Sequence, residues 1–205
     1  MSKVAGLVLA AGTSTRMGRP KQLLQVEGMS LLDRVLIEAL NSELTLVVLV
    51  LGYKAQEIKK DLKTQIHHPK LKIIENRNYK DGISSSIISG LSEVEDEYDH
   101  CMIILADMPH ITVNTINRLL NQYLASRLPL GSIKIQNRRS HPVIFGRKLY
   151  PDILKLRGDL GARDLFIKYR DDVCLVEPEE NYSDMDIDTP DDYLEFKKKI
   201  GEIKA

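Results

Sequence analysis

The feature that most constrains the fold is an apolar run near the N-terminus that leads directly into a loop rich in glycine and hydroxyl side chains. Residues 3–10 (KVAGLVLA) have the composition of a strand that is buried on both faces, and residues 11–21 (AGTSTRMGRPK) follow without a break. Glycine lets the backbone turn sharply and approach a ligand, so that several N–H groups can point at one anion. Arg16 and Lys21 add full positive charge to that loop, which predicts a site for the phosphates of a nucleotide.

The loop matches neither the Walker A pattern nor the dinucleotide-binding G-x-G-x-x-G pattern. An ordinary turn between a strand and a helix is therefore the alternative interpretation. The two cations Arg16 and Lys21, spaced along the loop, favour phosphate binding over that alternative.

Strand-like and helical segments alternate along the first two-thirds of the chain. Strands are expected at residues 3–10, 44–51, 71–75 and 101–106, and helices at residues 31–41, 55–63, 85–93 and 113–125. This alternation predicts a mostly parallel sheet with helices on both faces.

The pattern changes after about residue 130. Short strands are expected at 132–136 and 142–145 around a polar turn at 137–141, and helices at 147–156, at 162–169 and from 189 onward. Thr189 is a suitable N-cap for the last helix, with Pro190 at its first position. We expect one domain over residues 1–205, with a nucleotide-binding half at 1–130 and an acceptor-binding part at 131–205.

Composition excludes several classes of protein. Lys and Arg together number 29, as do Asp and Glu, so the chain has no net charge that would attract nucleic acid or an anionic membrane. Cys101 and Cys174 are too few and too far apart for a disulfide framework or a zinc knuckle. No apolar stretch reaches 18 residues and the first segment is a core strand, so we expect a soluble cytoplasmic protein.

A carboxylate follows the strand expected at 101–106. Asp107 at the end of a buried strand is costly unless it meets a cation, and Mg²⁺ prefers one or two carboxylates together with phosphate oxygens. The alternative is that Asp107 caps the helix that begins near Thr112. In open α/β sheets ligands bind at the carboxyl ends of the strands, so Asp107 should converge there with the first loop and with residues 76–86.

A second acidic cluster precedes the last helix. On an extended segment, Asp184, Asp186 and Asp188 would lie on one face and could complete a magnesium site with Asp107. A solvated turn in which Asp188 helps to cap the last helix is equally compatible with the sequence.

Further polar segments are candidates for ligand contact. Residues 81–86 (DGISSS) combine free amides and three hydroxyls, of which helix capping accounts for one. His141, beside Arg138 and Arg139, could contact an anionic acceptor or lie in a plain surface turn. Residues 158–163 (GDLGAR) could bind an anion or simply begin a helix.

Taken together, these motifs resemble those of the MobA-like nucleotidyltransferases. Residues 9–12, 16–18 and 20–21 look like the signature loop of that family, and Asp107 within LADMP matches its metal-binding motif. Four further stretches resemble the molybdenum cofactor cytidylyltransferase (MocA-type) branch, namely residues 81–90, 141–143, 158–163 and 186–190. The resemblance covers nearly the whole chain.

The resemblance implies a Rossmann-like nucleotide-diphospho-sugar transferase fold, a three-layer α/β/α sandwich. It implies transfer of CMP from CTP to the phosphate of molybdenum-loaded molybdopterin, with release of pyrophosphate and with Mg²⁺ as cofactor. The product, molybdopterin cytosine dinucleotide, would serve a molybdoenzyme of the xanthine dehydrogenase type. The alternatives are GTP as donor, a sugar or alcohol phosphate as acceptor, or a non-catalytic accessory protein for a molybdoenzyme.

Roles are carried over residue by residue. Arg16, Lys21 and Asp107 are the expected catalytic residues, and Asp107 and Asp188 the expected metal ligands. The expected nucleotide contacts are Ala10, Ala11, Gly12, Thr13, Arg16, Lys21, Gly82, Ser85, Ser86 and Asp107. The expected acceptor contacts are His141, Asp159 and Arg163.

Base choice depends on two of these positions. Guanylyl-transferring relatives have glycine where this chain has Ala11, whose methyl group should narrow the base pocket and favour a pyrimidine. Ser86 looks like the serine that contacts cytosine in related cytidylyltransferases. Ser140 and Ile83 stand where glycine and methionine are common, and these differences bear on the acceptor rather than on the nucleotide.

Overall fold

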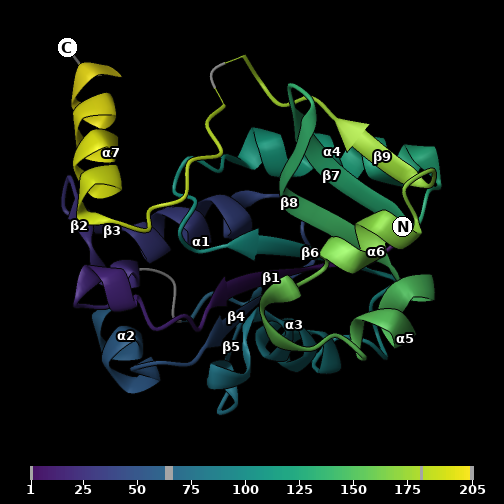
Figure 1. The fold of residues 1–205 in the computed structure, drawn as a ribbon, viewed down its shortest axis with the longest axis horizontal. Helices are drawn as coiled ribbons and strands as arrows, with labels where there is room; N and C mark the ends of the chain where they lie inside the picture. Colours follow the sequence, from purple (N-terminus) through teal and green to yellow (C-terminus); the bar gives the residue numbers. More distant parts are fainter. Residues whose placement is uncertain (1, 63–66, 181, 204–205) are drawn as a thin grey trace.

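The computed structural model describes residues 2–62, 67–180 and 182–203. Within these ranges, a sheet of seven strands forms the centre of the molecule, in the order β5-β4-β1-β6-β8-β7-β9 (Figure 1). These strands are β1 (Val4–Ala10), β4 (Leu46–Leu51), β5 (Leu71–Glu75), β6 (His100–Leu105), β7 (Leu130–Ile135), β8 (Arg138–Gly146) and β9 (Val173–Val176). A separate two-stranded ribbon consists of β2 (Gln25–Val26) and β3 (Met29–Ser30).

The strand directions confirm the prediction of a mostly parallel sheet. β1 pairs in parallel with both β4 and β6, β4 with β5, and β7 with β9. Only β8 runs against its neighbours β6 and β7 in the described sheet. β1 is buried along its whole length, as its continuous apolar composition predicts. The carboxyl ends of β1, β4, β5 and β6 therefore lie on one edge of the sheet.

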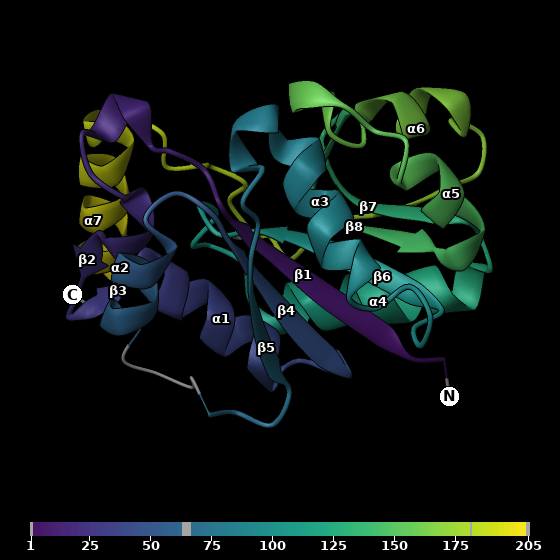
Figure 2. The same ribbon diagram turned by 90° about the horizontal axis from the view of Figure 1, so that it is seen from below.

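Helices cover both faces of this sheet, which confirms the predicted three-layer arrangement (Figure 2). One layer contains α1 (Leu31–Asn41), α2 (Ala55–Asp61) and α4 (Val113–Ser126), and the other contains α3 (Ile83–Ser92), α5 (Tyr150–Ile153) and α6 (Arg163–Lys168). Each layer has its own apolar core: Leu36 and Ile116 belong to one, and Ile87 and Phe166 to the other. Among the described helices, none has the length and apolarity required to cross a bilayer.

The last helix, α7 (Pro190–Ile203), lies apart from both layers beside the β2–β3 ribbon (Figure 1). Its start is as predicted: Pro190 is its first residue, and the Thr189 hydroxyl accepts a hydrogen bond from the Asp192 amide at 3.2 Å. The Asp192 carboxylate accepts in return from the Thr189 amide at 2.7 Å, which completes a reciprocal cap. Phe196 and Ile187 join a small third core there.

Two predictions about local structure are wrong. The turn expected at 137–141 is confined to Gln136 and Asn137, and β8 already begins at Arg138. The positive φ of 53° at Gln136 allows a tight connection, so the polar residues continue as a strand. The short edge strand β9 was not expected, because four residues that include the half-exposed Leu175 carry little pattern.

Three expected helices are shorter in the structure than predicted. α2 ends at Asp61, and residue 63 of the expected helix lies outside the described residues. The helix expected at 147–156 is a 3₁₀ turn, Arg147–Leu149, followed by the short α5. The helix expected at 162–169 is α6, one residue shorter at each end.

Gly52, at the end of β4, has no room for a side chain. A Cβ atom there would lie 2.7 Å from the Cβ atoms of both Ala11 and Tyr79 and 2.8 Å from the Ala11 carbonyl oxygen. We expect Gly52→Ala to lower the free energy of unfolding by about 1–3 kcal/mol in urea denaturation, because backbone atoms must move. Gly12→Ala is the control, since a Cβ atom at Gly12 meets nothing within 4 Å. Equal stability of the two variants would contradict this account of the packing.

Candidate active site

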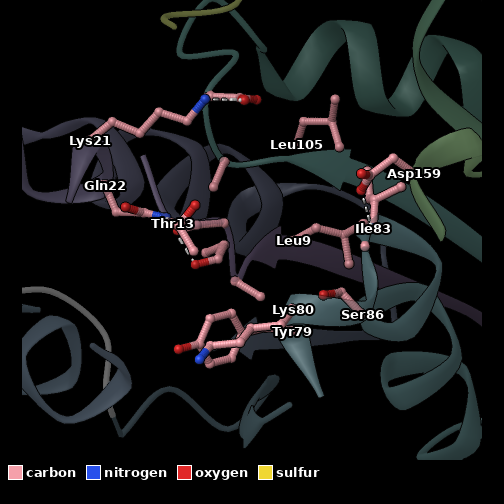
Figure 3. Close-up of a pocket in the computed structure, with 16 residues that line it drawn as sticks. Leu9, Thr13, Lys21, Gln22, Tyr79, Lys80, Ile83, Ser86, Leu105 and Asp159 are labelled. Atoms are coloured by element: carbon pink, nitrogen blue, oxygen red, sulfur yellow. Dashed lines mark hydrogen bonds and ion pairs between the residues drawn. The ribbon is translucent and has the colours of Figure 1, made fainter. Parts of the chain in front are cut away.

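Three polar segments that follow β1, β5 and β6 meet in one cavity of about 440 Å³ at the carboxyl edge of the sheet (Figure 3). The predicted nucleotide contacts that line it are Ala10, Ala11, Gly12, Thr13, Lys21, Gly82, Ser86 and Asp107. Tyr79, Lys80 and Gln22 line it as well and were not predicted. The expected convergence of the three segments is therefore present in the structure. The side chain of Arg16 lies outside what the structure describes, although its backbone belongs to the short turn Thr15–Met17.

Gln22 holds the first loop in shape. Its buried side-chain amide donates to the carbonyl oxygens of Ala10 at 3.0 Å and Gly12 at 3.3 Å. The Ser14 hydroxyl accepts from the Lys21 amide at 3.1 Å and so closes the loop from the other side. Gly12 and Thr13 remain exposed between these two anchors. Sequence analysis missed Gln22, because a single glutamine beside a charged residue has no recognisable pattern.

Lys21 joins three distant segments of the chain. Its Nζ donates to Asp107 Oδ2 at 2.7 Å and to Asp188 Oδ1 at 2.6 Å, and its side chain is only 14% exposed. Burial alone would lower the pKa of Lys21, but the two carboxylates outweigh burial and the pKa is raised above 10.5. The Ile187 amide also donates to the Asp107 carbonyl at 2.9 Å, which fixes the segment before α7 against the end of β6.

Asp107 does not cap the helix that follows it. Thr112 has that role, because its hydroxyl accepts from the Thr115 amide at 3.1 Å. The second carboxylate oxygen of Asp107, Oδ1, is buried and has no hydrogen-bond partner in the described part of the chain. A buried carboxylate oxygen without a donor fits a divalent cation that the fold family implies at this position.

The prediction that Asp184, Asp186 and Asp188 share one face is wrong for Asp184. Residues 182–189 form no regular strand, and Asp184 pairs with Arg138 at 2.7 Å, away from Lys21. Burial, then repulsion from Asp188 and Asp107, raises the pKa of Asp186. Over the described ranges no group of three or more acidic, histidine or cysteine side chains could hold a metal. Two carboxylates, from Asp107 and Asp188, are the candidate ligands.

Of the three serines at the start of α3, only Ser86 lines the cavity. Gly82 occupies the N-cap position, and the Asp159 carboxylate accepts a hydrogen bond from the Ile83 amide at 3.2 Å, so none of these serines caps the helix. The amide of the buried Asn76 donates to the hydroxyls of Ser85 at 2.8 Å and Ser86 at 3.1 Å. Ser86 then lines the cavity, whereas Ser85, a predicted nucleotide contact, does not. Asn76 was not predicted as part of this arrangement.

A second cavity of about 830 Å³ adjoins the first. Ile83, Leu105 and Asp159 line both cavities and form the wall between them. The predicted acceptor contacts His141, Asp159 and Arg163 all line the second cavity. Two substrates bound in the two cavities would therefore meet at this shared wall.

The register of the sheet places β8 in the second cavity. β8 pairs with β6 only from Val143 to Gly146, so its polar residues 138–141 extend beyond the paired part of β6. His141 consequently lies in a strand and not in the expected surface turn. Burial lowers the pKa of His141, and its Nδ1 is buried without a hydrogen-bond partner in the described chain. His141 therefore lines the second cavity with one buried ring nitrogen that no described protein group satisfies.

Comparison with known proteins places these residues in context. The MobA-like NTP transferase domain matches residues 6–173. A molybdenum cofactor cytidylyltransferase from Escherichia coli (strain K12) is 28% identical over 204 residues, which cover 99% of this chain and 100% of that protein. A nicotine blue oxidoreductase from Paenarthrobacter nicotinovorans is 29% identical over 194 residues, which cover 91% of this chain and 92% of that protein.

Solved structures share the architecture. A nucleotidyl transferase from Methanothermobacter thermautotroptrophicus matches with a TM-score of 0.81 and 20% identity, over 99% of this chain and 100% of that chain. This likeness confirms the predicted Rossmann-like fold of the nucleotide-diphospho-sugar transferases.

We expect Lys21→Met to lower the free energy of unfolding by about 1–3 kcal/mol at pH 7, because it leaves two partly buried carboxylates without their shared cation. The contribution of Lys21 is present below pH 10.5 and is lost as the pH rises through the raised pKa. The difference between wild type and variant should therefore be constant from about pH 7 to 9.5 and should shrink above 10.5. Urea denaturation across this pH range measures it.

Lys54→Met is the matched control for Lys21→Met. Lys54 also pairs with a carboxylate, that of Glu57 at 2.9 Å, but both side chains are well exposed. Its replacement should change stability much less. If the two lysine variants are equally stable, the bridge from Lys21 to Asp107 and Asp188 does not stabilise the fold.

Proposed function

The chain belongs to the MobA-like NTP transferase family and is a transferase, and from this premise we propose that it moves CMP from CTP to the phosphate of molybdenum-loaded molybdopterin. Pyrophosphate would be released and molybdopterin cytosine dinucleotide formed. The observation that carries this proposal is the pair of adjoining cavities with the common wall of Ile83, Leu105 and Asp159. One cavity has a loop suited to phosphates, and the other has basic side chains suited to an anionic acceptor.

The similarity to a named oxidoreductase is as high as that to the named cytidylyltransferase, so overall identity does not select the reaction. The proposal therefore rests on the site residues. A carboxylate at the end of β6, a lysine beside it and a preshaped glycine loop together suit a triphosphate with a divalent cation.

In the proposed reaction, a phosphate oxygen of the acceptor attacks the α-phosphorus of CTP in line. The new bond forms between that oxygen and the α-phosphorus, and the bond from the α-phosphorus to the bridging oxygen of pyrophosphate breaks. No covalent enzyme intermediate is required, so the protein contributes position and charge. Lys21, and Arg16 by family resemblance, would neutralise the triphosphate and the charge that develops on the leaving group.

Asp107 and Asp188 are the residues that would hold Mg²⁺, with Asp186 close by. When bound, the ion would neutralise charge on the phosphate oxygens. The ammonium of Lys21 lies between the same two carboxylates. Lys21 is therefore close enough to move from the carboxylates to the phosphates when the nucleotide binds.

Ala11 and Ser86 support cytosine as the base. Ala11 lines the first cavity, and its methyl group lies so close to Gly52 that a Cβ atom on Gly52 would come within 2.7 Å of it. The Ser86 hydroxyl is held by Asn76 at 3.1 Å and lines the same cavity. A narrow pocket with a fixed hydroxyl suits a pyrimidine better than the larger guanine.

The proposal is tested by measuring pyrophosphate release with Mg²⁺ and each of CTP, GTP, ATP and UTP, with and without molybdenum-loaded molybdopterin. Release that requires both CTP and the pterin supports it. Release with GTP instead would keep the fold and the mechanism but change the base, and release with a sugar or alcohol phosphate would change the acceptor. If the folded protein releases no pyrophosphate with any donor, the result would favour the role of a non-catalytic accessory protein.

We expect Asp107→Asn to lower kcat by on the order of 10²–10³, because it removes a carboxylate that would hold the divalent cation on the phosphates. Circular dichroism should show an unchanged fold. Asp99→Asn is the control, since Asp99 is 58% exposed and lines neither cavity. Near-normal turnover of Asp107→Asn would remove this residue from the catalytic machinery.

We expect Ala11→Gly to increase the ratio of kcat/KM for GTP to that for CTP, since the loss of one methyl group widens the base pocket. A change of one methyl group is worth about 10-fold to 200-fold in discrimination. Ser86→Ala should lower kcat/KM for CTP without raising kcat/KM for GTP. An unchanged ratio in Ala11→Gly would show that the base is selected elsewhere.

A further inference from the structure

The basic side chains of the second cavity differ in whether their charge is already paired. Arg138 forms a two-pronged ion pair with Asp184, at 2.7 Å and 2.5 Å. Arg139, the next residue of β8, has no carboxylate partner among the residues that the structure describes. Its charge is therefore available to a ligand, whereas the charge of Arg138 is largely neutralised.

Arg139 is held over an aromatic ring instead. Its guanidinium carbon lies 5.1 Å from the centre of the Phe166 ring, and both residues line the second cavity. Phe166 is itself anchored in the core, 6% exposed, with its ring centre 6.0 Å from that of Phe145. An arginine over such a ring presents a flat, cationic surface.

Apolar side chains lie exposed around this surface. Ile167 of α6 is 67% exposed and Leu175 of β9 is 47% exposed, and both line the same cavity. Most large apolar residues of the described chain are buried, so two of the most exposed ones meet at a single cavity. A flat ring could cover them there.

The two ends of the cavity have different chemistry. The end at the shared wall contains Asp159, which lines both cavities. Arg139, Phe166, Ile167 and Leu175 line the second cavity but not the shared wall. A substrate with its phosphate at the shared wall would extend away from that wall along the rest of this lining, which includes these four residues.

We infer that Arg139 stacked on Phe166, together with Ile167 and Leu175, forms a ring seat for the acceptor. This ring seat takes the flat conjugated ring system of a phosphorylated heterocycle, while the phosphate points to the shared wall. The inference rests on the proposed function for the identity of the acceptor, and it makes Arg139 a determinant of acceptor specificity. Arg139 takes no part in binding CTP, because it does not line the first cavity.

The ring seat is tested on the full chain with pterin-6-carboxylate, whose own fluorescence reports binding. Arg139→Ala should weaken binding by about tenfold, which corresponds to the stacking and charge of one guanidinium. Arg139→Lys retains the positive charge but lacks the planar guanidinium group, so it should weaken binding nearly as much as Arg139→Ala does. Arg118→Ala, on α4 across the sheet, is the matched control and should bind as wild type does.

Two competitors distinguish recognition of the ring from recognition of the anionic group. The neutral 6-methylpterin should displace the probe from wild type, and glycerol phosphate at the same concentration should not. Wild-type binding by Arg139→Ala, full binding by Arg139→Lys, or displacement by glycerol phosphate alone would each overturn the ring seat.

Turnover distinguishes this inference from the proposed function. With CTP and the pterin acceptor, Arg139→Ala should raise the KM for the acceptor by about tenfold and leave the KM for CTP unchanged. If no nucleotide supports turnover but Arg139→Ala still binds the fluorescent pterin more weakly than wild type, the ring seat stands and the proposed reaction fails. If turnover occurs with an unchanged acceptor KM in Arg139→Ala, the reaction stands and the ring seat fails.

Discussion

The bridge from Lys21 to Asp107 and Asp188 is the interaction on which the candidate site depends. It joins the first loop, the end of β6 and the segment before α7, which lie far apart in the sequence. Each partner alone would be costly at such burial, and together they neutralise one another in part. With two carboxylates and one lysine, the cluster keeps a net negative charge, which favours a cation beside it.

The antiparallel strand β8 has two halves with different surroundings. Its apolar half completes the sheet between β6 and β7, and its polar half extends beyond β6 into the second cavity. The same strand therefore supplies core residues such as Phe145 and cavity-lining residues such as His141 and Arg139. A parallel strand in this position would need a crossover connection, whereas an antiparallel one returns through the two residues Gln136 and Asn137.

Much of the fold and part of the site could be predicted, because both follow local patterns. Helix α1 and strand β5 have the predicted bounds, since their apolar spacing is regular and their ends carry clear signals. The position of residues 11–21 at the candidate site could be predicted from glycine and charge alone, and phosphate binding by this loop stays a prediction. Gln22, Asn76 and the pairing of Arg138 with Asp184 could not be predicted, because each depends on partners distant in the chain.

What the sequence by itself determined is the order of strands and helices and the set of polar residues at the strand ends, because hydrophobic period and glycine placement are local properties. Only the tertiary structure decided which charges are paired. It places Lys21 between Asp107 and Asp188, commits Arg138 to Asp184 and leaves Arg139 over Phe166. Ion pairing depends on distances of a few ångströms between segments, and those distances exist only after the sheet has fixed its register.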